Sequence, residues 1–152
     1  MIIDRAGFVE YFRKLAEDHK DVNSFIYGSS ERLLRAITSD LDYPVVMLAM
    51  PDVAILPDDG GEKYVSTLLF LTGASNDEDE EDAAIEAMYR VGRSFHMRLK
   101  NDSQYGDFGY GRSETSLQVK ARRTADNCWG YVLDFDMILR GEGCYDPSDF
   151  VP

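Results

Sequence analysis

The most conspicuous chemical feature of the sequence is a run of acidic residues from Asp77 to Asp82. Clustered carboxylates bind hard cations such as Ca²⁺, and an EF-hand loop needs glycine at its sixth position and glutamate at its twelfth. Counted from Asp77, those positions hold Asp82 and Met88, so the run does not match. Because acidic side chains are favoured in the first turn of a helix, the run is predicted to be a solvated helix start, and we expect no metal.

Histidine and cysteine are the next candidates for chemistry. His19 and His96 are far apart and lack the cysteine pairs of a zinc site. Cys128 or Cys144 together with His96 would supply a nucleophile and its base. Neither cysteine lies in a recognisable nucleophile motif, so we expect no catalytic residue from this set and no cofactor.

Asp134 and Asp136 have the spacing of two residues on one face of a strand. Such a pair could divide acid and base roles in a small hydrolase. Basic residues on the neighbouring predicted strand offer a simpler explanation, because Lys120, Arg122 and Arg123 would balance the two carboxylates across the sheet. A hydrolase is therefore kept only as a remote alternative, and the protein is not expected to be an enzyme.

Glycine alternates with the aromatic residues Tyr105, Phe108 and Tyr110 just before Arg112. The glycine order differs from that of a phosphate-binding loop, and no Lys-Ser or Lys-Thr follows. The composition is typical of a loop whose aromatic side chains become ordered against a partner. A loop folded onto its own core is the alternative.

Composition limits the classes of protein and partner. The chain has 152 residues, of which 44% are hydrophobic, and this fits one domain over residues 1–152 with an irregular tail from about residue 141. The net charge of −12 argues against nucleic-acid phosphates and anionic membranes as partners. No apolar run is long enough to span a membrane and no signal peptide is recognisable, so a cytoplasmic protein is expected. Two cysteines fit a reduced compartment, with a single disulfide left open.

Hydrophobic periodicity predicts an α+β fold with a largely antiparallel sheet of four to five strands and helices packed on a face. The order is two helices, three strands, a helix and two strands. Helices are expected at residues 4–20, 30–39 and about 78–100, and strands at Tyr43–Met50, Val53–Leu56, Glu62–Gly73, Glu114–Arg123 and Cys128–Leu139. Residues 101–113 are expected to form a loop.

Charge is unevenly distributed along the chain. Residues 41–82 contain eleven acidic side chains and one basic, whereas residues 83–123 contain eight basic and four acidic. A positive segment of one copy could dock on the negative segment of the next, and such a head-to-tail contact closes into a ring. The alternative is that helix-dipole preferences placed these charges and that solvent screens them. The candidate interface residues are Tyr105, Phe108, Tyr110, Arg112, Arg90, Arg93, Lys120, Arg122, Arg123 and Tyr145.

Three stretches of local sequence, together with the element order, carry a resemblance to a known class of proteins. They are Phe8-Val9-Glu10-Tyr11-Phe12 with Leu15-Ala16 and His19-Lys20-Asp21, then Tyr43-Pro44-Val45-Val46, and finally Cys144-Tyr145-Asp146-Pro147. In these stretches the chain resembles small tail-completion or tail-terminator proteins of tailed phages and of phage-tail-like contractile injection systems.

The resemblance implies a structural protein without a cofactor. Terminators form rings, often hexameric, that cap a tail tube or sheath and stop its polymerisation. The expected partners are therefore further copies of the chain and the tube or sheath proteins of a phage-like particle, with no specific nucleic acid, membrane or small-molecule substrate. An acidic intracellular adaptor, chaperone or immunity-type binding protein is the main alternative.

Overall fold

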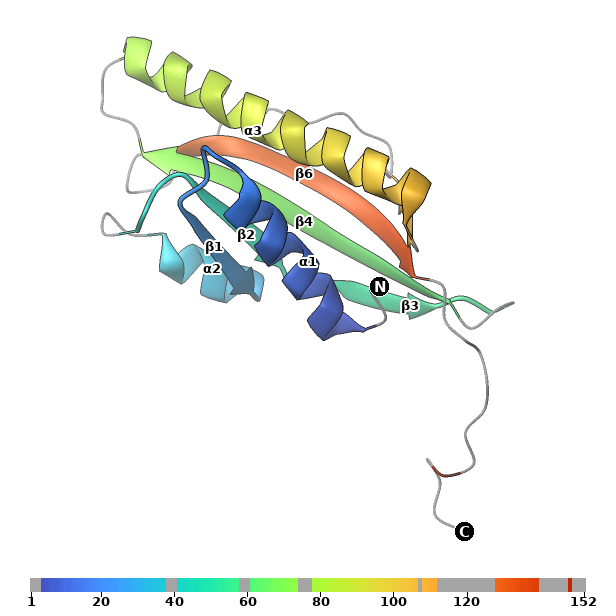
Figure 1. Ribbon diagram of the computed structural model, residues 1–152. Helices are drawn as coiled ribbons and strands as arrows, with labels where there is room; N and C mark the ends of the chain where they lie inside the picture. The colour runs from blue at the N-terminus through green and yellow to red at the C-terminus, as the bar shows by residue number, and fades with distance from the viewer. Residues whose placement is uncertain are drawn as a thin grey trace.

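The computed structural model describes residues 4–37, 41–57, 61–73, 78–106, 108–111, 128–139 and 148. Within these ranges the chain forms three helices and six strands, which confirms the α+β class (Figure 1). In chain order they are α1 (Arg5–Asp18), β1 (Ser24–Gly28), α2 (Ser30–Ala36), β2 (Val45–Ala49), β3 (Asp52–Ile55), β4 (Glu62–Gly73), α3 (Glu78–Tyr105), β5 (Phe108–Gly111) and β6 (Cys128–Leu139).

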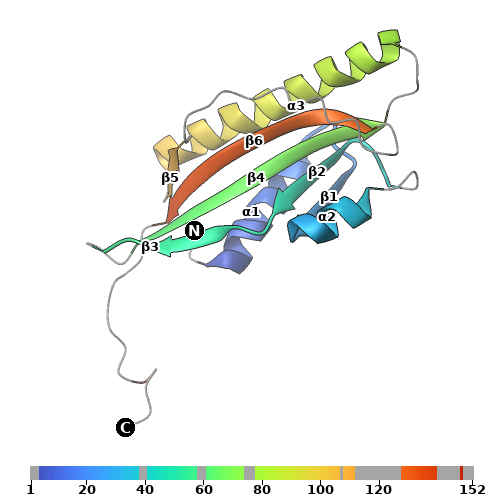
Figure 2. The ribbon, with the colours of Figure 1, turned by 180° about the vertical axis from the view of Figure 1, so that it is seen from behind.

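The strands form one mixed sheet in the order β1-β2-β4-β6-β5, with β3 paired to β4 as well. Only β1 and β2 are parallel, so the sheet is largely antiparallel, as predicted. At its centre β4 and β6 pair along their full lengths, from Glu62 opposite Leu139 to Gly73 opposite Cys128. β2 and β3 lie one after the other along the same side of β4 (Figure 2).

Helices cover both faces of the sheet, but unequally. α1 and α3 lie across one face, which we call the inner face, and the short α2 packs against the other, outer face beside β1 and β2 (Figures 1 and 2). The prediction of helices on a single face therefore holds for two helices and fails for α2. Leu33 of α2 is the reason, because it is buried against the outward side chains of Val45, Met47 and Leu71.

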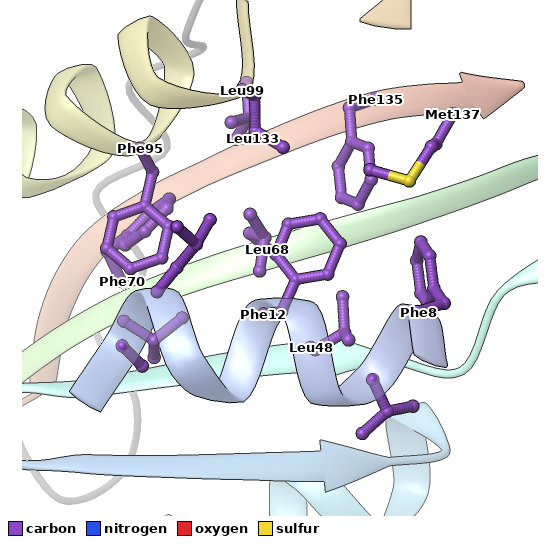
Figure 3. Close-up of a cluster of buried hydrophobic side chains, with 14 of the residues drawn as sticks. Phe8, Phe12, Leu48, Leu68, Phe70, Phe95, Leu99, Leu133, Phe135 and Met137 are labelled. Carbon is purple, nitrogen blue, oxygen red and sulfur yellow. The ribbon is translucent and has the colours of Figure 1, made fainter. Parts of the chain in front are cut away.

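The main core fills the space between the inner face and the two long helices (Figure 3). Phe12 of α1 is fully buried, and its ring centroid lies 5.1 Å from that of Phe8 and 5.2 Å from that of Phe135 on β6. Side chains of both central strands alternate between core and outer face, as their period of two predicts. The labelled core residues in Figure 3 are Phe8, Phe12, Leu48, Leu68, Phe70, Phe95, Leu99, Leu133, Phe135 and Met137.

Local sequence explains where the first two helices begin. The Asp4 carboxylate accepts a hydrogen bond from the Gly7 amide at 2.8 Å, and the Ser29 hydroxyl accepts one from the Arg32 amide at 3.2 Å. Each side chain thus satisfies a backbone donor that has no partner inside its helix. α1 ends at Asp18 and α2 at Ala36, earlier than the ends predicted at residues 20 and 39.

Two expectations about the elements need correction, and two others are untested. No strand was expected at Ser24–Gly28, which is β1 at the edge of the sheet. The expected loop at 101–113 is wrong in part, because α3 continues to Tyr105 and Phe108–Gly111 is the strand β5. The expected strand Glu114–Arg123 and the tail from about residue 141 lie outside the described residues, apart from Ser148.

Candidate interaction surfaces

The exposed face of α3 carries acidic side chains in its first half and basic side chains in its second. The helix buries Met88, Val91, Phe95 and Leu99, so the side chains between these positions face water. The exposed acidic residues are Asp79, Glu80, Asp82 and Glu86, and the exposed basic residues are Arg90, Arg93, Arg98 and Lys100.

Part of this charge is neutralised within the helix. Ion pairs four residues apart join Glu86 to Arg90 at 3.5 Å and Asp102 to Arg98 at 3.0 Å. Among the residues that the structure describes, Arg93 and Lys100 form no ion pair. Met97 lies between them at helical spacing and is 53% exposed. We call Arg93, Met97 and Lys100 the basic patch.

The aromatic residues predicted to bind a partner are divided by the structure. Tyr105 ends α3 and is 85% exposed, which suits an interface. Phe108 is only 7% exposed and packs in the core, which corrects its assignment to the interface. Tyr110 is partly buried, and its hydroxyl is hydrogen-bonded to Nδ1 of His96 at 2.7 Å. The remaining candidates, Arg112, Lys120, Arg122, Arg123 and Tyr145, lie outside the described residues.

A hydrogen-bonded cluster holds the basic half of α3 against α1. The Tyr11 hydroxyl donates to Oδ2 of Asp102 at 2.6 Å, and Nε of Arg98 donates to both oxygens of the same carboxylate at 3.0 Å. Burial works to raise the pKa of Asp102, but hydrogen bonds from Tyr11 and Arg98 outweigh it and hold that pKa below its usual value. Burial, followed by the hydrogen bond to Asp102, raises the pKa of Tyr11.

We expect Tyr11→Phe to lower the free energy of unfolding by about 1.5 kcal/mol at pH 7, because it removes a hydrogen bond to a charged group. Tyr11 keeps its proton in the folded state, whereas the unfolded side chain ionises near pH 10. Its contribution is therefore complete below pH 10 and declines above it. Urea unfolding should show the advantage of the natural protein over the variant shrinking by about 1.4 kcal/mol between pH 7 and pH 11.

Tyr105→Phe is the matched control, because Tyr105 is exposed and should change stability by less than about 0.5 kcal/mol. An equal stability difference between the natural protein and Tyr11→Phe at both pH values would contradict the role given to the Tyr11 hydroxyl.

The two aspartates of β6 lie together on the outer face, as the spacing predicted, and both have partners from β4. Asp134 accepts a hydrogen bond from the Thr67 hydroxyl at 2.6 Å. Asp136 forms an ion pair with Lys63 at 3.6 Å. These cross-strand contacts explain the two carboxylates as part of the sheet.

The sheet separates the residues of the suggested cysteine–histidine pair. The Cys128 side chain is buried on the outer face, where its thiol contacts the Tyr43 hydroxyl at 3.0 Å. His96 belongs to α3 on the inner face. His19 follows α1 and stacks on Phe95 with 5.7 Å between ring centroids, and burial lowers its pKa. These contacts do not bring a histidine to Cys128, and Cys144 lies outside the described residues.

One exposed surface was not recognised from the sequence. β3 was predicted as a strand, and all four of its residues prove to be exposed, including Val53 at 46% and Ile55 at 77%. The sequence contained one signal for an edge strand, because the predicted strand is short and lies between Pro51 and Pro57. Proline is confined to the ends and edges of sheets.

Comparison with known proteins does not identify a family. No protein-family model matches the chain. The search of curated proteins also gave no match. Among the described parts of the chain, none of the helices has the length and apolarity required to cross a bilayer.

Proposed function

We propose that the protein is a structural assembly protein whose copies join head to tail into a ring that caps the tube or sheath of a phage-like tail. The observation that carries this proposal is the opposite charge of the early and the later turns on the exposed face of α3, acidic from Asp79 to Glu86 and basic from Arg90 to Lys100. The resemblance of the N-terminal stretch and of the first predicted β-strand to tail terminators supports the same conclusion.

The acidic and the basic part of α3 lie too far apart to neutralise each other's charge. From Asp82 to Lys100 the helix rises about 27 Å at 1.5 Å per residue. The Debye length at physiological salt is about 8 Å, so the acidic end does not neutralise the basic end of the same helix. Each end can therefore attract the opposite end of another copy. When the same two different surfaces join every pair of copies, the assembly closes into a ring if the rotation permits.

The basic patch has the composition of an interface and not only of a solvated helix. Met97 offers exposed apolar surface, and Arg93 and Lys100 flank it with charges that lack an ion-pair partner among the described residues. An apolar centre with a charged rim, enriched in methionine and arginine, is typical of protein–protein contacts. Tyr105 extends this surface at the end of the helix.

Light scattering should find a species several times the 17.2 kDa mass of one chain at about 0.1 M salt and mainly single chains at about 1 M. The lower concentration is chosen because it already screens the overall repulsion between copies of charge −12 but not contacts shorter than the Debye length of about 10 Å. The double variant Arg93→Glu/Lys100→Glu should remain a monomer at both salt concentrations.

Two further samples make the test specific. Lys14→Glu/Lys20→Glu changes the net charge equally at exposed positions near α1 and should assemble normally. Glu80→Lys/Asp82→Lys should fail to assemble alone but should associate when mixed with Arg93→Glu/Lys100→Glu, because the mixture restores opposite charges. A natural protein that stays monomeric at both salt concentrations would remove the self-assembly argument and favour the acidic adaptor.

A further inference from the structure

β3 forms an open edge of the sheet. It pairs with β4 on one side, and β1 covers only β2, so the other side of β3 carries no strand among the described residues (Figure 2). Natural proteins usually blunt such edges with charged residues, proline or a covering element. Here Asp52 is the only charged residue of the strand, and Pro51 and Pro57 lie beyond its two ends, so Val53–Ile55 between them is left without such protection.

The register shows which backbone groups point away from the sheet. The Leu56 amide donates to the Gly61 carbonyl at 2.7 Å, so these opposed residues are a hydrogen-bonded pair. Hydrogen-bonded and non-hydrogen-bonded pairs alternate along an antiparallel ladder. Ala54 and Asp52 therefore bond toward β4, whereas the N–H and C=O groups of Val53 and Ile55 point outward.

The same two residues carry the exposed apolar side chains of the edge. Val53 and Ile55 lie on one face, because they are opposite Tyr64 and Glu62 of β4. Their exposed fractions are 46% and 77%. A strand added here would gain backbone hydrogen bonds and cover apolar surface at the same positions, which is the arrangement used in β-strand addition.

We propose that this edge binds β3 of a second copy, antiparallel, about a two-fold axis through Ala54. In this register Val53 lies opposite Ile55 of the partner copy, so both residues with outward backbone groups form hydrogen-bonded pairs. Their apolar side chains also meet on one face. The small Ala54 side chains face each other at the non-hydrogen-bonded position, where strands approach most closely. Asp52 lies opposite Leu56 of the partner copy, so no two carboxylates meet.

The contact is independent of the charged contact between α3 helices. It consists of backbone hydrogen bonds and apolar cover, so salt should not dissolve it. Four residues span only about 14 Å of strand, and such a contact buries less than the roughly 1,200 Å² of a standard stable interface. Dimers should therefore form only above the protein concentrations of the light-scattering test, in which single chains are expected at about 1 M salt, and should persist at that salt.

Disulfide trapping tests the register. The two-fold axis places the Cα atoms of the two Ala54 residues about 4.5 Å apart, within the range that a disulfide bridges. Ala54→Cys should therefore give a covalent dimer under mild oxidation. Ile55→Cys should not, because its two copies would be more than about 7 Å apart. The natural chain, with Cys128 and Cys144, measures the background. Cross-linking of Ile55→Cys instead of Ala54→Cys would overturn the proposal.

Sedimentation over a range of concentrations at about 1 M salt tests the contact without oxidation. Ile55→Lys should weaken dimerisation at least about tenfold, because a charge replaces apolar cover on the edge. Leu34→Lys is the matched control, since Leu34 is 62% exposed on α2, and it should dimerise like the natural protein. A natural protein that is monomeric at every concentration, or an Ile55→Lys variant that dimerises normally, would overturn the proposal. Neither result bears on the salt-sensitive assembly proposed above.

Discussion

Gly130→Ala is expected to lower the free energy of unfolding by about 3 kcal/mol or more. A Cβ atom at Gly130 would overlap the carbonyl oxygen of Phe70 and would lie 2.8 Å from Cδ2 of Leu71. The oxygen belongs to the backbone of the central strand β4, so it cannot turn aside as a flexible side chain would. Thermal unfolding should show a midpoint lower by about 6–12 °C for a domain of this size.

Two other strand glycines provide controls for Gly130. Among the described residues, a Cβ at Gly73 would meet only Tyr43, at 3.8 Å, and one at Gly109 would meet only Ile138, at 3.5 Å. Both distances are ordinary van der Waals contacts, so each alanine variant should stay within about 1 kcal/mol of the natural protein. If Gly130→Ala melts like these two variants, the close approach of β4 and β6 at this position is wrong.

Phe12→Ala is expected to cost about 3–5 kcal/mol, the range for truncating a fully buried aromatic side chain. Phe12 is 0% exposed, and its ring contacts Phe8 from the same helix and Phe135 from β6. Removing it leaves a cavity where α1 meets the sheet, and the surrounding side chains can close it only in part. Chemical denaturation with a circular-dichroism readout measures the loss.

Phe12→Leu serves as the graded comparison because it retains most of the buried apolar volume. We expect it to cost clearly less than Phe12→Ala. Lys14→Ala, on the exposed side of the same helix, should change stability by less than about 0.5 kcal/mol. Equal losses for the alanine and leucine variants at position 12 would argue against a cavity as the cause.

Sequence patterns predicted the long helices and strands because the spacing of hydrophobic residues within each of them indicates which of its sides is buried. The alternation in Glu62–Gly73 and Cys128–Leu139 predicted both strands, and the structure confirms both. Hydrophobic periodicity likewise predicted a helix at residues 4–20, and α1 buries Phe8 and Phe12. For the candidate surface, helical periodicity alone was enough to predict that Arg90 and Arg93 are exposed.

Elements that depend on distant partners were missed or misplaced. Asn101-Asp102-Ser103 has weak helix propensity, yet α3 continues through it because Asp102 is held by Arg98 and by Tyr11. Phe108 looked like a loop aromatic, but its strand pairs with β6 and its ring contacts that of Tyr11. No local pattern reports such long-range contacts.

The exposed edge at β3 shows a different limit of sequence patterns. A period of two indicates which side chains share a face, but it does not say which strands lie at the edge of a sheet. The edge position follows from the order of strands, and in particular from β1 ending beside β2. For this reason the most exposed apolar side chains of the strand, Val53 and Ile55, were not candidates before the topology was known.

The full-length pairing of β4 with β6 also governs how the chain can be made. β4 leaves the ribosome long before β6, and Leu68 and Phe70 lack their β6 partners until Tyr131 and Leu133 are synthesised, although β2 is already available on their other side. Local contacts cannot substitute for that pairing, so we expect the closure of the long loop between β4 and β6 to slow folding. During that interval the apolar faces of β4 are open to aggregation and to chaperones. The central pairing thus waits for β6, which is synthesised after all three of the described helices.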